Sequence, residues 1–350
     1  MIKLRGLEQA PTRISFLGIG VFIISILSTC AHAPHVKAVN IVWPENNPRI
    51  YYVRSVYSAN DLGIKPGWFS RIFNFIAGEN SRYSTRFSPF AIAAYKGVIG
   101  VTDIQASNVI LFDKGNNSFA VISKCGASYF TAPTGIAITG KRIYVADSSQ
   151  KTIFIISSRG RCIGNINNGS FIRPTSVAVA QNGDVYIVDT GMNRVFVYDD
   201  KGKPKFSFGS HGDRAGEFNF PTAIAIKNNT VFIIDSLNFR IQTFSLSGKF
   251  ISSFGRQGDG SGDFARPKSI AVDSDGIIYI TDALFDVVQM FNGKGDYLMT
   301  FGRHGTDDGE LSMPAGIAVE HSYIYVADGL NNRIDIFKRI GDTKNEALHQ

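Results

Sequence analysis

Two residue types recur in step along the chain, and this repetition limits the fold more than any other feature of the sequence. Six prolines recur at spacings of 44, 41, 47, 46 and 47 residues: Pro89, Pro133, Pro174, Pro221, Pro267 and Pro314. Six aspartates, each at the end of an apolar run, recur at spacings of 44, 42, 46, 47 and 46 residues: Asp103, Asp147, Asp189, Asp235, Asp282 and Asp328. Because two independent markers keep the same period, the chain contains six copies of one structural unit.

Each unit contains four short segments with the composition of β-strands. The first alternates large and small side chains, as in 224–226, the second is apolar throughout, as in 277–280, and the fourth mixes serine and threonine with aromatic residues. An apolar strand is covered on both faces, and small side chains suit strands that crowd around an axis. The change from small side chains in the first strand to polar side chains in the fourth predicts an all-β, six-bladed β-propeller of four-stranded antiparallel blades. A solenoid would need capping units at both ends.

The sixth unit lacks its fourth strand. Its third strand ends at Phe337, and a polar tail follows. Residues 49–56, before the first unit, read Arg-Ile-Tyr-Tyr-Val-Arg-Ser-Val, which is typical of a strand. We therefore expect this N-terminal strand to complete the last blade and close the ring, which removes the open edges that invite aggregation.

The repeated motifs resemble those of a known family. The units combine a Pro-x-x-Ile-Ala-Val strand, a Tyr-Val-x-Asp strand, an Asn-Arg-Ile strand and a Phe-Gly ending. This pattern, together with the loop at 208–218, resembles NHL repeats, which build six-bladed β-propellers. The resemblance covers residues 87–338, and in the first two units Asn108 and Thr152 stand where three later units have arginine. It implies the fold and leaves the activity open, because this architecture hosts unrelated functions.

The first thirty residues are predicted to direct export. Basic residues precede an uncharged, mostly apolar run at 14–27, which is shorter than the roughly 20 residues of a membrane-spanning helix and fits a secretory signal. The run ends in a sequence that resembles the lipobox of bacterial lipoproteins, so Cys30 is the predicted lipidation site, although Thr29 departs from that pattern. Cleavage at 31–33 and an uncleaved anchor are the alternatives. All three place the body of the protein outside the cytoplasm. The lipoprotein interpretation places it in the cell envelope, anchored in a membrane on the periplasmic or outer-membrane side.

These features divide the chain into five parts. They are a signal peptide of the lipoprotein type at 1–29, an anchor and tether at 30–48, a closing strand with a short amphipathic helix at 49–86, the NHL-type propeller at 87–338 and a polar tail at 339–350. Within the third part, residues 68–77 place their apolar side chains on one helical stripe. This helix is expected to pack over one mouth of the ring or to lie on the membrane.

The six aspartates allow two interpretations, a ring of carboxylates for a cation or a structural role at the end of each second strand. In three units an arginine follows five residues later, and these pairs are expected to tie the turns together: Asp189 with Arg194, Asp235 with Arg240 and Asp328 with Arg333. No innermost strand carries a set of metal ligands, and no nucleophile motif or phosphate loop is present. The sequence therefore predicts no catalytic residue, metal or cofactor. A metal-dependent lyase or lactonase of the propeller type is the alternative.

Basic residues are concentrated in one part of the chain. Residues 65–161 contain twelve basic and four acidic residues, a net charge of +8, whereas residues 162–350 have a net charge of −4. An ordinary solvated surface explains such an excess, and a docking side for an anionic partner is the sharper interpretation. The residues predicted for that side are Arg82, Arg86, Lys141, Arg142, Lys151, Arg159 and Arg161. An exported chain is not expected to bind nucleic acid.

Two cysteines, Cys125 and Cys162, remain beyond the signal, and a disulfide between them is one option in an oxidising compartment. Together these features predict a lipid-anchored, non-enzymatic scaffold that binds another macromolecule, either a protein or an anionic component of the envelope. The long loops at 209–220, 255–266 and 302–313 are the expected contact surface, because rigid scaffolds present function on loops. A small-molecule sensor that binds in the central channel is a further alternative.

Overall fold

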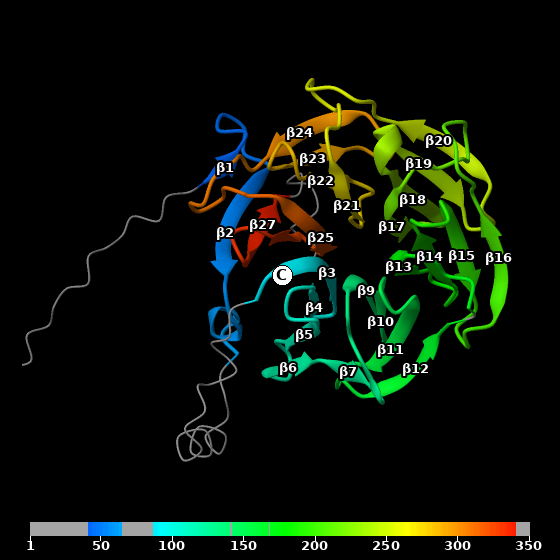
Figure 1. Cartoon of the computed structure of the whole chain (residues 1–350). Coiled ribbons are helices and arrows are strands. Elements are labelled where there is room, and N and C mark those ends of the chain that lie inside the picture. The colour runs from blue at the N-terminus through cyan, green and yellow to red at the C-terminus, as the bar shows by residue number, and fades with distance from the viewer. Residues whose placement is uncertain (1–40, 65–86, 141, 168, 341–350) are drawn as a thin grey trace, which may run out of the picture. The chain divides into compact units, whose positions relative to one another are not determined.

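Six antiparallel sheets surround a common axis and form a β-propeller (Figure 1). The computed structural model describes residues 41–64, 87–140, 142–167 and 169–340. The first sheet is β3 (Pro89–Tyr95), β4 (Val98–Asp103), β5 (Asn108–Asp113) and β6 (Ser118–Ile122). The second is β9 (Pro133–Thr139), β10 (Arg142–Asp147), β11 (Thr152–Ser157) and β12 (Cys162–Ile166). The third is β13 (Pro174–Val179), β14 (Val185–Asp189), β15 (Arg194–Tyr198) and β16 (Pro204–Phe208).

The remaining blades repeat this order from the axis to the rim. The fourth is β17 (Pro221–Lys227), β18 (Thr230–Asp235), β19 (Arg240–Ser245) and β20 (Phe250–Phe254). The fifth is β21 (Pro267–Val272), β22 (Ile278–Asp282), β23 (Val287–Phe291) and β24 (Tyr297–Phe301). The sixth contains β25 (Pro314–Glu320), β26 (Tyr323–Asp328) and β27 (Arg333–Arg339). The six predicted units are therefore six blades, and each marker proline begins an innermost strand.

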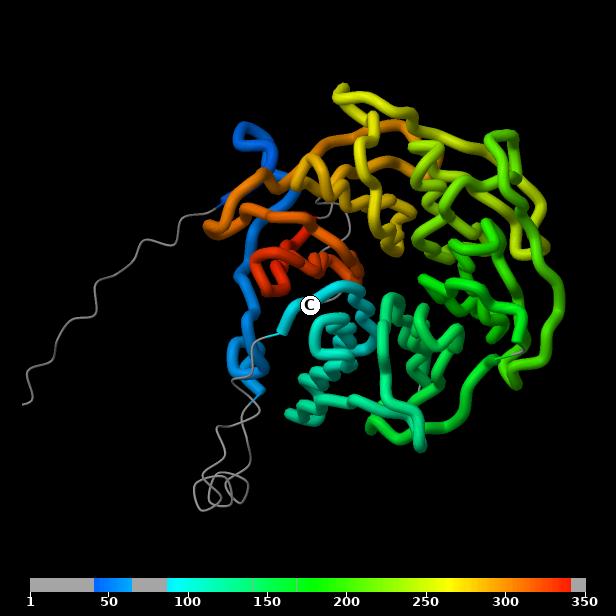
Figure 2. Tube along the Cα trace, viewed as in Figure 1, coloured from blue at the N-terminus to red at the C-terminus, as the bar shows by residue number. Residues whose placement is uncertain are grey.

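The ring closes at the sixth blade, as predicted. β2 (Ile50–Val56) pairs antiparallel with β27, with Ile50 opposite Arg339 and Val56 opposite Ile334. A short strand that the sequence did not predict, β1 (Val42–Trp43), adds to the outer edge of β2. Along the inside, β3 of blade one contacts both β9 of blade two and β25 of blade six. The tube in Figure 2 shows the same closed ring, with the N-terminal segment of β2 in blue beside the C-terminal segment of β27 in red.

The apolar core is divided among the spaces between blades. Six clusters of buried side chains occur, and each is shared by two neighbouring blades. Between blades three and four, for example, Val195 packs in the same cluster as Ile233. All five residues of β14 and of β22 are buried, whereas β16 is mostly exposed. The second strand of a blade is thus covered on both faces, as its apolar sequence indicates.

Short elements complete the described chain. They are the 3-10 helices η1 (Ala59–Leu62) and η3 (Ser236–Asn238) and the hairpin strands β7 (Lys124–Cys125) and β8 (Ser128–Tyr129). Within the described ranges, no helix has the length and apolar character needed to cross a membrane. Residues 1–29, Cys30 and the expected helix at 68–77 lie outside the described residues.

Candidate functional site

The inter-blade loops and the turns between second and third strands lie at the same end of the strands. In blade three, Pro174 at the start of β13 pairs with Asp189 at the end of β14. Val195 of β15 in turn pairs with Phe208 at the end of β16. The other blades share this antiparallel register, so their corresponding loops and turns form one surface. We call this surface the loop face.

The six repeated aspartates fasten the loops of this face. All six are buried, and each carboxylate accepts a hydrogen bond from a backbone N–H in the loop that enters its own blade. Asp189 accepts from the N–H of Arg173 at 2.9 Å, and Asp282 accepts from the N–H of Arg266 at 2.9 Å. These contacts support the structural interpretation of the aspartates. They also fix the backbone of two arginines at the centre of the loop face.

The three predicted aspartate–arginine pairs differ in geometry. Arg240 forms an ion pair with Asp235 at 2.9 Å, and Arg333 forms one with Asp328 at 3.2 Å. Both arginines also donate to carbonyl oxygens of the preceding inter-blade loop. Arg194 lies opposite Asp189 in the register, but its Nε donates to the carbonyl of Gly209 at 3.0 Å. Each of the three arginines therefore holds an inter-blade loop. Arg194 differs in that it holds the loop that follows its blade, and its partner is a carbonyl instead of the expected carboxylate.

A second carboxylate joins the buried pair in blade six. Asp335 accepts from Arg333 at 3.0 Å and from the hydroxyl of Ser55 on the closing strand. Burial raises the pKa of Asp335 to about 8 and also raises the pKa of Asp328. One guanidinium thus serves two buried carboxylates, which titrate as a pair. This network links the closing strand to the last blade.

The central channel holds a cavity of about 350 Å³ that all six innermost strands line. Each strand contributes an alanine at the fourth position after its marker proline: Ala93, Ala137, Ala178, Ala225, Ala271 and Ala318. Threonine hydroxyls lie nearer the loop face, where Thr175 and Thr190 share a hydrogen bond of 2.6 Å. The Oγ1 of Thr222 is buried and has no hydrogen-bond partner among the described residues. The channel is therefore apolar at its waist and polar at one mouth.

Basic side chains surround that polar mouth. Arg173 and Lys268 both line the cavity, and Arg266 is exposed just before the start of β21. The guanidinium carbon of Arg173 lies 5.6 Å from the centroid of the Phe220 ring, a cation–π geometry. Burial lowers the pKa of Lys268, and the charges of Arg266 and Arg173 lower it further. The mouth is thus a positively charged opening above a neutral channel.

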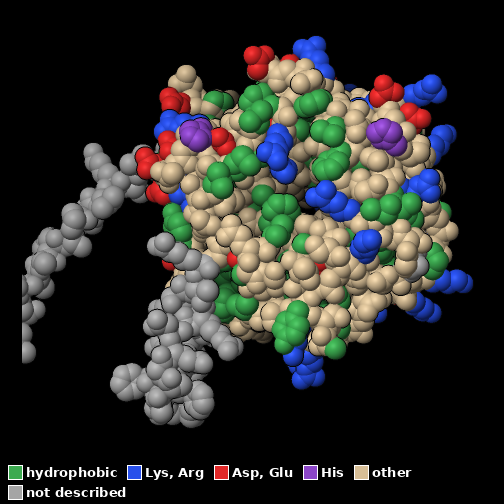
Figure 3. Space-filling model, in the orientation of Figure 1, with side chains coloured by type: hydrophobic (Ala, Val, Ile, Leu, Met, Phe, Trp, Pro, Cys, Tyr) green, Lys and Arg blue, Asp and Glu red, His purple; other side chains and the backbone are tan. Residues whose placement is uncertain are grey.

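Large apolar side chains are exposed around this mouth. Leu237, Leu284 and Leu330 occupy the same place, two residues after the marker aspartate, in blades four, five and six, with exposed fractions of 53%, 63% and 65%. Ile172 and Phe220 are exposed in the loops that enter blades three and four. Figure 3 shows hydrophobic and basic side chains side by side around the opening, with most acidic side chains toward the rim.

The basic side predicted from the sequence is not a single surface. Arg142 pairs with Ser157, so it lies with Arg159 and Arg161 at the end of the strands away from the loop face. Lys151 belongs to the turn at the loop face, before Thr152. Arg82, Arg86 and Lys141 lie outside the described residues. The charge of a sequence segment does not specify a face of the propeller, because every blade contributes loops to both faces.

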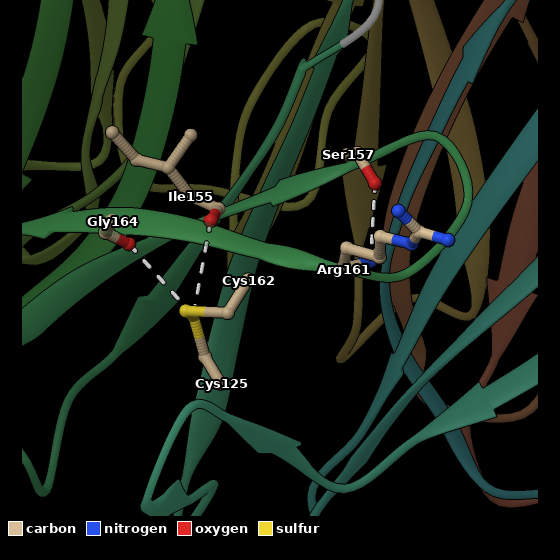
Figure 4. Close-up of a disulfide and its surroundings, with 6 residues drawn as sticks. All are labelled: Cys125, Ile155, Ser157, Arg161, Cys162 and Gly164. Atoms are coloured by element: carbon tan, nitrogen blue, oxygen red, sulfur yellow. Dashed lines mark hydrogen bonds between the residues drawn. A yellow bond between two sulfur atoms is a disulfide. The ribbon is translucent and has the colours of Figure 1, made fainter.

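Cys125 and Cys162 form a disulfide (Figure 4). Cys125 lies on β7, in the connection between blades one and two, and Cys162 begins the outer strand of blade two. The Sγ of Cys125 is 3.8 Å from the carbonyl oxygens of Ile155 and Gly164. The bond therefore attaches this connection to the blade that follows it.

Among the described residues, side chains of the types that bind metal ions do not form a cluster on the loop face. His304 Nδ1 is 2.7 Å from Asp286 Oδ2 in an exposed pair. In the ranges that the structure describes, no group of three or more His, Cys, Asp and Glu side chains is placed to hold a metal ion.

Arg173, Lys268 and Arg266 were not singled out by sequence reasoning. The signal that could have found them is the pair of positions that flank the marker proline, which the repeat places at the channel mouth in every blade. Among the six units, these two positions carry a basic residue only in units three and five.

Comparison with known proteins gives the fold. A family described as a 6-bladed beta-propeller matches residues 170–248 and 223–301. This chain is a six-bladed β-propeller. "Protein brain tumor" of Drosophila melanogaster is 33% identical over 61 residues, which are 17% of this chain and only 6% of that protein.

Solved structures agree with this fold at low sequence identity. A protein of unknown function from Bacteroides thetaiotaomicron has a TM-score of 0.59 and 17% identity, covering 74% of this chain and 71% of that one. A gluconolactonase from Xanthomonas campestris has a TM-score of 0.55 and 13% identity, with 73% and 88% covered. A virginiamycin B lyase from Staphylococcus aureus has a TM-score of 0.53 and 14% identity, with 73% and 96% covered. Such likenesses establish architecture, and function has to be argued from the site.

Proposed function

We propose that this protein is a non-enzymatic scaffold of the NHL-repeat type that is anchored in the cell envelope and binds another protein through its loop face. The observation that carries the proposal is the set of exposed leucines in three consecutive blades. An isolated exposed leucine needs no explanation, but contiguous apolar patches mark interaction sites.

The chemistry of the loop face suits a protein partner. Interfaces combine apolar anchors with arginine and aromatic residues at their centre. The loop face offers the exposed Leu284 and Leu330, and it also offers Phe220 in contact with Arg173. Because its central cations have no carboxylate partner in the described residues, we propose a partner that presents acidic side chains around an apolar contact.

The anchoring of the loops supports a recognition role. Buried aspartates and partly or fully buried arginines bind the loop backbone at several points. Asp235 accepts from the N–H of Asn219, and Arg240 donates to the carbonyl of Glu217. A surface held in this way loses little conformational entropy when a partner binds.

The proposal can be tested with a photoreactive amino acid in place of Leu284, and a matched control in place of Ile251. Ile251 is exposed to a similar extent, 55%, but lies on the outer strand β20. In the native envelope, we expect a discrete crosslinked product from position 284 and none from position 251. Leu330→Ser should lower the yield at position 284 by about tenfold. Equal yields at both positions, or a yield insensitive to Leu330→Ser, would contradict the proposal.

The proposed envelope location rests on the apolar run at 14–27 and on Cys30. A disulfide between Cys125 and Cys162 suits an oxidising compartment. We expect Cys30→Ser to release the protein from the membrane fraction. If this variant still sediments with membranes, another segment is the anchor.

The alternative function is a metal-dependent lyase or lactonase. A gluconolactonase and a virginiamycin B lyase have a similar architecture. Such an enzyme needs several protein ligands to its metal, and the described part of this chain brings no such group together. Chelator-sensitive turnover of gluconolactone or of a streptogramin by the purified protein would favour the enzyme over the scaffold.

A further inference from the structure

Three cations lie near one another at the channel mouth. The side chains of Arg173, Arg266 and Lys268 take part in no ion pair with a carboxylate in the described ranges of the chain. Lys268 is mostly buried, and both arginines act on it electrostatically. Holding like charges together in a partly desolvated place costs free energy, and an anion between them would remove that cost.

The space below these cations can hold the rest of a ligand. The cavity of about 350 Å³ lies at the small end of the range of ligand pockets. Its polar wall includes the hydroxyl pair of Thr175 and Thr190 and the buried hydroxyl of Thr222, which has no hydrogen-bond partner in the described part of the chain. Below these hydroxyls comes the ring of six alanines, which leaves the waist of the channel open and uncharged.

We infer that the channel mouth is a binding site for a small organic carboxylate. Its charged end lies between Arg173 and Lys268, and its uncharged body extends past the threonine hydroxyls toward the alanine ring. This site goes beyond the protein-binding role proposed above. It shares the cations at the mouth with the proposed contact surface, but it uses the interior of the mouth and not the exposed leucines, so the two roles can be tested by different substitutions.

The geometry favours a carboxylate over a phosphate. Phosphate sites are commonly built from several free backbone N–H groups in a loop or at a helix end. Here the N–H groups of Arg173 and Arg266 already donate to Asp189 and Asp282. The side chains remain as donors, and a planar guanidinium matches a carboxylate in a two-point hydrogen bond.

The opposite mouth serves as an internal comparison. A larger cavity of about 830 Å³ lies there, lined in part by Arg142, Lys227 and Asp200. Arg142 donates to the backbone carbonyl of Asp200 at 2.7 Å, so this cation is already engaged. Arg142→Met is therefore a matched control for the loss of a positive charge elsewhere on the propeller.

Calorimetric titration of the purified protein with benzoate tests the inference. Benzyl alcohol and inorganic phosphate are titrated in parallel. We expect saturable binding of benzoate at one site, and no binding of the neutral alcohol. Lys268→Met should raise the Kd for benzoate by about tenfold or more, as should Ala225→Phe, which fills the waist, while Arg142→Met and Leu284→Ser leave it unchanged. Circular dichroism and the melting temperature check that each variant folds.

Three results would overturn the inference. They are no saturable binding of benzoate, binding of benzyl alcohol with equal affinity, or binding of phosphate that benzoate does not displace. Since Leu284→Ser disturbs only the proposed protein contact, a failure of carboxylate binding is distinguishable from a failure of the scaffold proposal.

Discussion

Replacing Arg333 by methionine tests how the last blade is held. The side chain of Arg333 is buried and donates to Asp328 and Asp335, and also to the carbonyls of Thr306 and Glu310. Methionine keeps the stem and removes the charge, which leaves two buried carboxylates without a cation. Breaking a buried ion pair in this way costs about 3–5 kcal/mol in the free energy of unfolding.

Arg240→Met in blade four is the matched control. Arg240 makes the same kind of ion pair, with Asp235, but it is partly exposed. In its blade the place of Asp335 is taken by Gln242, which donates to Asp235 at 3.1 Å, and Asn238 donates at 2.8 Å. Asp235 therefore keeps neutral donors when the arginine is lost. We expect a smaller cost for this variant, about 1.5–3 kcal/mol.

The two variants should also differ in their response to pH. Without Arg333, the pKa values of both carboxylates in the folded state rise further above their values in the unfolded chain. The folded protein then binds more protons than the unfolded one, so its stability falls as pH increases, by up to about 1.4 kcal/mol per pH unit for each carboxylate. Urea unfolding at pH 5 and pH 8 measures this, and equal, pH-independent losses in both variants would refute the reasoning.

Three further changes have defined outcomes. Because the pKa of Asp335 is raised to about 8, its contribution to stability is present below the unfolded value near 4 and is lost as pH rises toward 8. Asp335→Asn should therefore flatten the decline of the unfolding free energy with pH, measured by urea unfolding. If the decline is unchanged in this variant, it belongs to another group. Cys162→Ser removes a link between residues 37 positions apart, and should lower the unfolding free energy by about 2–4 kcal/mol, with reductant destabilising only the parent protein. Gly255 has a φ of 89°, and an added Cβ would lie 2.3 Å from Cε2 of Phe264, whereas Gly276, with a φ of 81°, has open space around it. In thermal unfolding we expect Gly276→Ala to lower the unfolding free energy by about 1–2 kcal/mol and Gly255→Ala to lower it by about 1–3 kcal/mol more. Equal losses in the two variants would contradict the clash with Phe264.

The blades were predictable because their information is local and repeated. Each marker proline begins an innermost strand and each marker aspartate ends a second strand, so two positions per unit set the register of the whole ring. The closing strand was also predictable, since the sixth unit lacks a strand and residues 49–56 supply a suitable one.

What the sequence did not reveal depends on distances between blades. Arg194 has an aspartate at the expected spacing, yet it donates to the carbonyl of Gly209, at the start of the next inter-blade loop. Arg173 and Lys268 are 95 positions apart in the sequence, and only the curvature of the ring brings them to one opening. The two-residue strand β1 carries too little pattern to be recognised.

The pairing of β2 with β27 gives the propeller a seam. Ser55 and Asp335, which meet across it, are 280 positions apart, so joining them costs about 3 kcal/mol more chain entropy than closing a connection of about ten residues. During synthesis, the first five blades can stack in turn while β2 waits with an unpaired edge. Ring closure therefore requires β27 to be synthesised. A chain interrupted before Arg333 keeps an unpaired strand edge that folding cannot remove.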